Sequence, residues 1–178
     1  LRGDIPAGAE FPAPDRYQYA YELIGEVKRH GDFCIGGACY PEGHVECPSQ
    51  REDLRHLKEK VDCGVDFLVT QMFFDNAKYF DFVARCRREG IEVPIVAGIK
   101  PFSTKAQLSL LPQVFGVNIP EELSRAVASA ADNTAVRRIG IEWAIGQCRE
   151  LIRQGVPALH FYTMSRPDNV EAVVKAVF

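Results

Sequence analysis

Four short apolar runs, separated by amphipathic segments, dominate the pattern of this sequence. The runs fall at about residues 32–39, 66–72, 94–99 and 158–163. They are continuous rather than alternating with polar residues, which is typical of parallel strands whose two faces are both covered. We therefore predict four consecutive parallel strands.

Apolar residues at helical spacing predict helices between these strands. The stripes consist of Leu54, Leu57 and Val61, of Tyr79, Phe82, Val83 and Cys86, and of Ile141, Ala144, Ile145, Cys148, Leu151 and Ile152. Gly64, Gly90 and Gly155 follow these stripes as helix stop signals. A further helix is expected over residues 19–27, and residues 103–133 add helical pieces punctuated by Pro112 and Pro120. Strand and helix thus alternate as in a parallel α/β fold, and we expect residues 1–178 to form a single domain.

An open sheet of four strands would leave two exposed edges, which natural proteins avoid. The chain has 178 residues, whereas a complete eight-stranded α/β barrel needs roughly 250. Leu1, Arg2, Gly3 and Asp4 resemble the end of a strand whose beginning is missing. We therefore expect the chain to be either a fragment of a larger protein or a partner to another half.

Composition excludes several classes of function. The 21 basic and 24 acidic residues give a net charge of −3, without the basic excess of a nucleic-acid-binding protein. No window approaches the ~20 apolar residues of a membrane span, and no signal peptide is visible. The six cysteines form no C-x-x-C pair, which argues against a metal site and favours buried, reduced thiols. We expect a cytoplasmic protein that contacts neither membrane nor nucleic acid.

In an α/β barrel, the active site lies at the C-terminal ends of the strands. This rule selects a polar and aromatic set: Arg2, Gly3, Asp4, Tyr40, Glu42, His44, Gln71, Asp75, Lys100, Tyr162, Thr163 and Arg166. The set lacks a Ser-His-Asp or Cys-His grouping, and the chain lacks a G-x-G-x-x-G turn. Such a site suits a bound cofactor that supplies the chemistry while the protein orients it.

One predicted helix carries a second candidate site. Asp53, His56 and Lys60 fall on one polar face, opposite the apolar stripe. Periodicity alone favours a solvated face without a role. The alternative is a support for the ribose and phosphates of a dinucleotide, with Lys60 facing a phosphate.

Six motifs, in this order and spacing, resemble the methylenetetrahydrofolate reductase family almost from end to end. They are Leu1-Arg2-Gly3-Asp4, Tyr40-Pro41-Glu42-Gly43-His44, Asp53 to Lys60, Thr70-Gln71-Met72-Phe73-Phe74-Asp75, Pro94 to Pro101 and His160-Phe161-Tyr162-Thr163-Met164-Ser165-Arg166. The resemblance implies a (β/α)8 TIM barrel, of which this chain holds roughly the second half: units five to eight and the end of strand four. It also implies FAD-dependent reduction of 5,10-methylenetetrahydrofolate to 5-methyltetrahydrofolate, with NADH or NADPH as electron donor, in a homo-oligomer.

The resemblance also assigns roles to individual residues and so favours the dinucleotide interpretation of the polar helix face. FAD would be held by Arg2, Gly3, Asp4, Tyr19, Ala20, Tyr40, His44, Val45, Glu46, Cys47, Asp53, His56 and Lys60. The folate would contact Asp4, Gln71, Gln107, Tyr162 and Arg166, and Arg166 would pair with its glutamate carboxylate. Asp4 would lie near the flavin's pyrimidine edge, where its charge makes the reduced flavin a stronger hydride donor.

Three departures from the family pattern matter. The first four strands, with further FAD contacts, are missing. Cys47 and Ser165 stand where many members have Ala and Asn. The third departure concerns the general acid. The family's general acid is a glutamate after the first strand, which nothing in this stretch replaces, so we expect these residues alone to be inactive. Two alternatives remain open. The chain could be a non-catalytic half or subunit that binds FAD or a partner, or it could belong to another flavin barrel, such as a relative of proline dehydrogenase.

Overall fold

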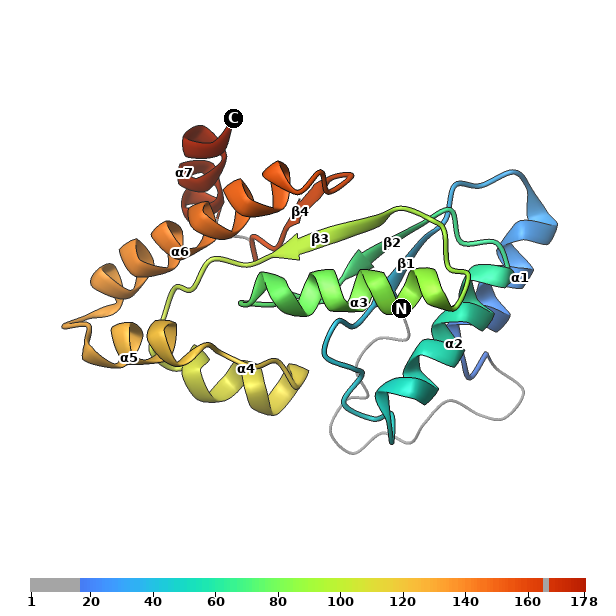
Figure 1. Ribbon diagram of the computed structural model, residues 1–178, viewed down its shortest axis with the longest axis horizontal. Coiled ribbons are helices and arrows are strands. Elements are labelled where there is room, and N and C mark those ends of the chain that lie inside the picture. Colours follow the sequence, from blue (N-terminus) through green and yellow to red (C-terminus); the bar gives the residue numbers. More distant parts are fainter. Residues whose placement is uncertain (1–16, 165–166) are drawn as a thin grey trace.

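The computed structural model describes residues 17–164 and 167–178 and contains one parallel sheet in this part of the chain. The strands are β1 (Gly36–Cys39), β2 (Phe67–Thr70), β3 (Ile95–Ile99) and β4 (Leu159–Phe161). They follow the order β1-β2-β3-β4, and every neighbouring pair is parallel (Figure 1). The prediction of four consecutive parallel strands is confirmed.

The described residues form seven helices, of which all but the last, α7, lie where the sequence predicts helices. They are α1 (Ala20–His30), α2 (Gln50–Asp62), α3 (Asn76–Arg88), α4 (Gln107–Phe115), α5 (Glu121–Ser129), α6 (Asn133–Arg153) and α7 (Asp168–Val177). The side chains of Ser49, Asp75 and Asp132 accept hydrogen bonds from backbone N–H groups in the first turns of α2, α3 and α6. The three glycines predicted as stop signals follow α2, α3 and α6 with positive φ, a conformation that glycine adopts without strain.

The first strand begins at Gly36, later than predicted, and side chains bond the backbone of Phe33 and of Ile35 before it. The ammonium of Lys28 donates to the Phe33 carbonyl at 2.8 Å, and the Asp66 carboxylate accepts the Ile35 N–H at 2.7 Å. Phe33 is 53% exposed and Cys34 is also exposed. The prediction of a buried strand was therefore wrong for Phe33 and Cys34.

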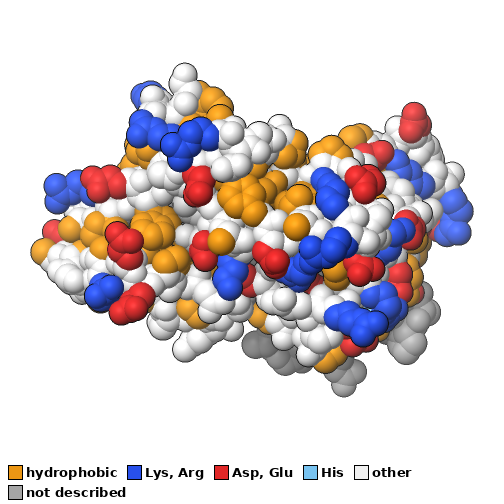
Figure 2. Space-filling view, viewed as in Figure 1, with side chains coloured by type: hydrophobic (Ala, Val, Ile, Leu, Met, Phe, Trp, Pro, Cys, Tyr) orange, Lys and Arg blue, Asp and Glu red, His pale blue; other side chains and the backbone are white. Residues whose placement is uncertain are grey.

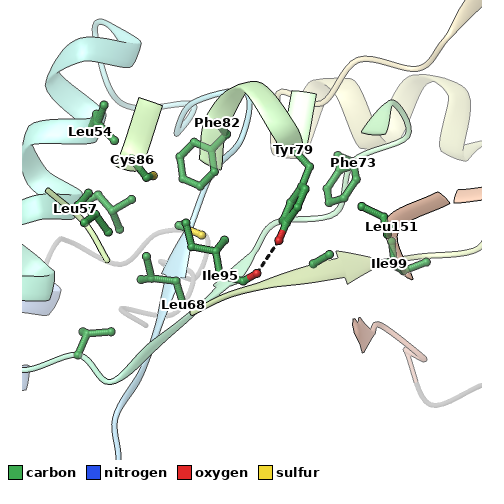
Figure 3. Close-up of a cluster of buried hydrophobic side chains, with 14 of the residues drawn as sticks. Leu54, Leu57, Leu68, Phe73, Tyr79, Phe82, Cys86, Ile95, Ile99 and Leu151 are labelled. Carbon is green, nitrogen blue, oxygen red and sulfur yellow. Dashed lines mark hydrogen bonds between the residues drawn. The ribbon is translucent and has the colours of Figure 1, made fainter. Parts of the chain in front are cut away.

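The main core lies between one face of the sheet and the helices. Its buried members include Cys39, Leu68, Ile95, Ala97 and Ile99 from the strands and Ile24, Leu57, Phe82, Cys148 and Val173 from α1, α2, α3, α6 and α7. Figure 3 shows the Tyr79 hydroxyl of α3 reaching the sheet, where it donates to the Ile95 carbonyl at 2.7 Å. Burial of this phenol raises the pKa of Tyr79 to about 12.

The unreversed strand order distinguishes this sheet from a doubly wound one, in which the order reverses and helices cover both faces. Here, helices α1, α2, α3, α6 and α7 all contribute to the same core on one face. Alternate strand residues, among them Ala38, Val69 and Val96, point to the other face and are only partly buried. This arrangement is the one found in a segment of a barrel wall.

Helices α4 and α5 form a second core beyond the C-terminal end of β3 (Figure 1). Its buried members are Met72, Phe74, Phe102, Leu111, Val117, Leu123, Val127 and Val136. Pro120 precedes α5 as predicted, but Pro112 lies inside α4. Helix α6 approaches this core closely, because a Cβ at Gly140 would lie 2.2 Å from the Phe102 carbonyl oxygen.

Opposite charges are interspersed over the outer surface of α2 and α3 (Figure 2), in ion pairs such as Arg55–Glu59 and Arg85–Asp81. In the described part of the chain, no helix is long and apolar enough to cross a membrane, and no cluster of His, Cys, Asp or Glu could hold a metal. All six cysteines are free, but only Cys39, Cys86 and Cys148 are buried. The expectation of buried thiols therefore holds for half of them.

Two glycines of α6 allow a matched test of this packing. Gly140→Ala should destabilise the protein by about 1–3 kcal/mol, because the new methyl group collides with the backbone of Phe102. Gly146→Ala, in the same helix, meets nothing within 4 Å and should be neutral or stabilise by up to about 1 kcal/mol. Urea denaturation measures both changes, and equal midpoints for the two variants would contradict the close approach of α6.

Candidate active site

The carboxyl ends of β1 and β2 place Tyr40 and Gln71 side by side. Cys39 pairs with Thr70 in the register of the two strands, and the Gln71 N–H donates to the Cys39 carbonyl at 2.7 Å. Because Cys39 points to the helices, the residue after it belongs to the opposite face. Tyr40 and Gln71 therefore begin the polar edge of the sheet, and both line one shallow depression there.

Tyr162, after β4, spans the sheet and binds the end of β2. Its hydroxyl donates to the Thr70 carbonyl at 2.8 Å, and its ring passes over Gly98 of β3, where a Cβ would lie 2.9 Å from the ring. In a parallel ladder, the Gly98 N–H would bond that same carbonyl. It instead donates to the Thr70 hydroxyl at 2.9 Å, so the Thr70 side chain replaces the lost ladder bond. Burial raises the pKa of the Tyr162 phenol, which stays neutral.

The segment that follows Gln71 is fixed by α6. The Trp143 indole N–H donates to the Phe74 carbonyl at 3.0 Å, and the Gln147 amide donates to the Phe73 carbonyl at 3.2 Å. The side-chain oxygen of Gln71 accepts the Met72 N–H at 3.0 Å. The amide nitrogen of Gln71 has no hydrogen-bond partner among the described residues.

Residues 40–47 form a folded turn at the end of β1. The rings of Tyr40 and His44 meet edge to face at 4.6 Å, the Glu46 N–H donates to His44 Nδ1 at 3.2 Å, and the Cys47 N–H donates to the His44 carbonyl at 2.9 Å. Val45 is exposed and reaches towards Gly116 at the end of α4. The turn is therefore organised around His44.

Glu42 was assigned no role by the sequence analysis beyond its place at a strand end. Its carboxylate accepts the backbone N–H of Asn118 at 3.1 Å and also bonds the Asn118 side chain. It therefore fastens the turn after β1 to the loop between α4 and α5. No pattern in the sequence connects these two distant positions.

Asp53 and Lys60 of α2 lie half-buried under this turn, so this helix face is not simply solvated. The Lys60 ammonium donates to the Ala38 carbonyl at 2.7 Å. Burial lowers the pKa of Lys60, and the nearby Cys39 and Asp53 only partly oppose this effect. Burial likewise raises the pKa of Asp53, opposed by His44, Lys60 and a hydrogen bond from the His44 backbone. Burial of the charged forms of Asp53 and Lys60 therefore costs desolvation free energy.

Four further predicted residues make contacts within the chain. The His56 ring lies 3.2 Å from the Glu59 carboxylate on the same helix, and His56 also contributes to lowering the pKa of Asp53. Tyr19 is 61% exposed and stacks on Tyr21, while Ala20 packs against the main core. The Gln107 side-chain oxygen accepts the backbone N–H groups of Ser103 and Thr104, so it closes the turn before α4. Arg2, Gly3, Asp4 and Arg166 lie outside the described residues.

Parallel strands with polar side chains at their carboxyl ends define an α/β protein with a candidate site at the strand ends. Comparison with known proteins gives the family. The family model of methylenetetrahydrofolate reductase matches residues 1–177. The chain belongs to the methylenetetrahydrofolate reductase family.

Two named relatives illustrate the match. The 5,10-methylenetetrahydrofolate reductase of Salmonella typhimurium is 39% identical over 97% of this chain and 57% of its own length. A probable methylenetetrahydrofolate reductase (NADPH) of Caenorhabditis elegans is 35% identical over 99% of this chain and 27% of its own length. The chain therefore spans 57% of the length of the first relative and 27% of the length of the second.

A solved structure is also similar. It is described as an uncharacterized protein from Clostridium thermocellum that binds two copies of 5-methyl-5,6,7,8-tetrahydrofolic acid. It matches with a TM-score of 0.59 and 18% identity over 88% of this chain and 56% of that chain. At this identity, the likeness concerns the fold alone.

The contact between Tyr162 and Thr70 can be tested by removing one oxygen atom. Tyr162→Phe should destabilise the protein by about 1–3 kcal/mol, because the Thr70 carbonyl loses its hydroxyl donor. Tyr17→Phe, at a residue that is 50% exposed, should leave the free energy of unfolding unchanged. Thermal unfolding of both variants measures the difference. A Tyr162→Phe variant as stable as the parent would mean that the hydroxyl is not bonded to Thr70.

Proposed function

We propose that the complete protein carrying this chain is a methylenetetrahydrofolate reductase. It reduces 5,10-methylenetetrahydrofolate to 5-methyltetrahydrofolate with FAD and a nicotinamide donor, NADH or NADPH. The observation that carries this proposal is the family match over residues 1–177, whose motif residues Tyr40, Gln71 and Tyr162 lie at one edge of the sheet. In the same proposal, the protein is a cytoplasmic homo-oligomer.

The chain is proposed to form the second half of the catalytic barrel, namely units five to eight and the end of strand four. The unreversed sheet supports this, because its helices lie on one face while Ala38, Val69 and Val96 remain only partly buried on the other. Closing a barrel would bury that second face and pair both edge strands. An N-terminal half of four more units would provide the closure and the general-acid glutamate.

The half-buried groups of α2 fit the polar parts of FAD. An ammonium has three donors, and Lys60 uses one on the Ala38 carbonyl, which leaves two for a phosphate. Asp53 offers a carboxylate that can accept from ribose hydroxyls, beside the turn organised by His44. Bound FAD would supply the hydride transfer between the nicotinamide and the folate. Arg2, Gly3, Tyr19, Ala20, Val45, Glu46, Cys47 and His56 complete the proposed FAD set.

Gln71 is proposed to orient whichever ring system occupies the reacting position. Since its oxygen is held by the Met72 N–H, its amide nitrogen can donate to a carbonyl of the pterin or of the nicotinamide. Tyr162, Gln107 and Arg166 would contact the rest of the folate. Asp4 would place a negative charge beside the flavin, which favours hydride donation to the folate over hydride acceptance.

Lys60 and Lys58 provide a matched test of FAD binding on one helix. Lys60→Met in the complete protein should release FAD on dilution roughly tenfold to a hundredfold more readily, the range of a charge-assisted hydrogen bond. Lys58→Met removes a charge that is paired with Asp62 on the surface, and it should retain FAD. Flavin fluorescence after dilution measures the release, and circular dichroism confirms folding. Equal retention in the two variants would exclude Lys60 from the FAD site.

Substitutions of Asp4 and Gln71 should affect the two half-reactions in different proportions. Gln71→Glu loses a donor that both ligands use and adds a charge, so reduction by the nicotinamide and reoxidation by the folate should both slow, by roughly tenfold or more. Asp4→Asn should slow mainly the reoxidation. Stopped-flow absorbance of the flavin in the complete protein measures each half-reaction separately. If Asp4→Asn slows only the reduction step, the role assigned to Asp4 is wrong.

A further inference from the structure

Lys100 is a buried cation at the carboxyl end of β3. Its exposed fraction is 9%, comparable to that of the core residue Leu54. Lysine is almost never buried to this extent unless its ammonium is paired. None of the residues in 17–164 and 167–178 forms an ion pair or a side-chain hydrogen bond with it. Burial lowers the pKa of Lys100, and no charged neighbour opposes the shift.

The alternation of side chains along β3 shows on which face of the sheet Lys100 lies. Ile95, Ala97 and Ile99 belong to the main core, so these alternate positions point to the helices. Lys100 precedes Pro101, and a residue before proline is held in an extended conformation, which continues the alternation. Lys100 therefore belongs to the same face as Gly98, the face on which the proposed ligand site lies.

Lys100 is also the register neighbour of Tyr162. Ile99 pairs with Phe161, and the Tyr162 N–H donates to the Ile99 carbonyl at 2.9 Å, so the next pair along the two strands is Lys100 and Tyr162. Lys100 is two residues further along the chain than Gly98, which pairs with His160, and is the next position on the same face of the sheet. Lys100 therefore lies nearer the carboxyl end of the sheet than Gly98 does.

We infer that Lys100 binds an anionic oxygen group of the ligand in this site and so contributes to its selectivity for anionic ligands. The inference rests on the proposed function, which offers two such groups: the carboxylates of the folate's glutamate tail and the phosphates of the nicotinamide dinucleotide. Keeping an unpaired ammonium in this position is unfavourable without a ligand. A carboxylate or phosphate would satisfy both its charge and its donors.

The test compares Lys100→Met with Lys78→Met in the complete protein. Methionine keeps the length of the side chain and removes its charge. Lys78 is exposed on the outer side of α3 and provides the matched control. Three dissociation constants are measured from the flavin absorbance: for a folate with a glutamate tail, for the same pterin compound without the tail, and for the nicotinamide donor. The melting temperature of each variant is recorded in parallel.

We expect Lys100→Met to weaken one anionic ligand by roughly tenfold to a hundredfold, with an unchanged or raised melting temperature because a buried charge is lost. A loss confined to the tailed folate identifies the carboxylates, and a loss confined to the nicotinamide donor identifies the phosphates. Lys78→Met should change none of these values.

Two results overturn the inference while leaving the proposed function intact. In the first, the parent protein reduces the folate, and Lys100→Met binds all three ligands as the parent does. In the second, Lys100→Met lowers the melting temperature without changing any affinity, which means that Lys100 is paired within the protein. A parent protein that neither binds FAD nor reduces the folate would refute the proposed function itself, and the inference with it.

Discussion

The absence of a side chain at Gly98 is the constraint on which the arrangement of the strand ends depends. Any Cβ there would lie 2.2 Å from the Thr70 carbonyl oxygen and would also meet the Tyr162 ring. Only glycine lets the ring of Tyr162 cross β3 and reach β2. The Thr70 hydroxyl then accepts the Gly98 N–H, so both this N–H and the Thr70 carbonyl keep a hydrogen-bond partner. Three of the four strands are thereby joined at the edge where Gln71 begins the polar segment.

Several charged side chains at this edge are buried, although water solvates their charged forms better. Asp53, Lys60 and Lys100 are all partly or fully buried, and in each the largest influence on the pKa favours the neutral form. A site of this kind is preorganised for a polar ligand, because the desolvation cost is met during folding and not at the moment of binding. The stability needed to hold these groups comes from the main core between the sheet and its helices.

The fold could be predicted from the sequence because its signals are local. The apolar stripes ending in Cys86 and Ile152 and the stop signal at Gly64 each depend on a few neighbouring residues. The features that the sequence did not predict depend on residues that are distant in the chain. Asp66 bonds the backbone of Ile35, and Glu42 bonds Asn118, 76 positions away in the chain. For the candidate site, the rule that active-site residues follow the strands selected Gln71 and Lys100. The burial of Lys100 and the crossing of Tyr162 over Gly98 depend on the register between strands. The periodicity of apolar residues does not predict this register.

The distribution of thiols has a practical consequence. Cys39, Cys86 and Cys148 lie in the main core, from β1, α3 and α6, and burial raises the pKa of Cys86 and Cys148 to about 11 and that of Cys39 well above its usual range. Since only the thiolate attacks an alkylating reagent, these three sulfurs stay protected while the core is closed. Cys34 is exposed and available throughout. The three buried thiols can therefore serve as chemical probes of unfolding. The order in which Cys39, Cys86 and Cys148 are alkylated reports whether the sheet and its helices separate together or in stages.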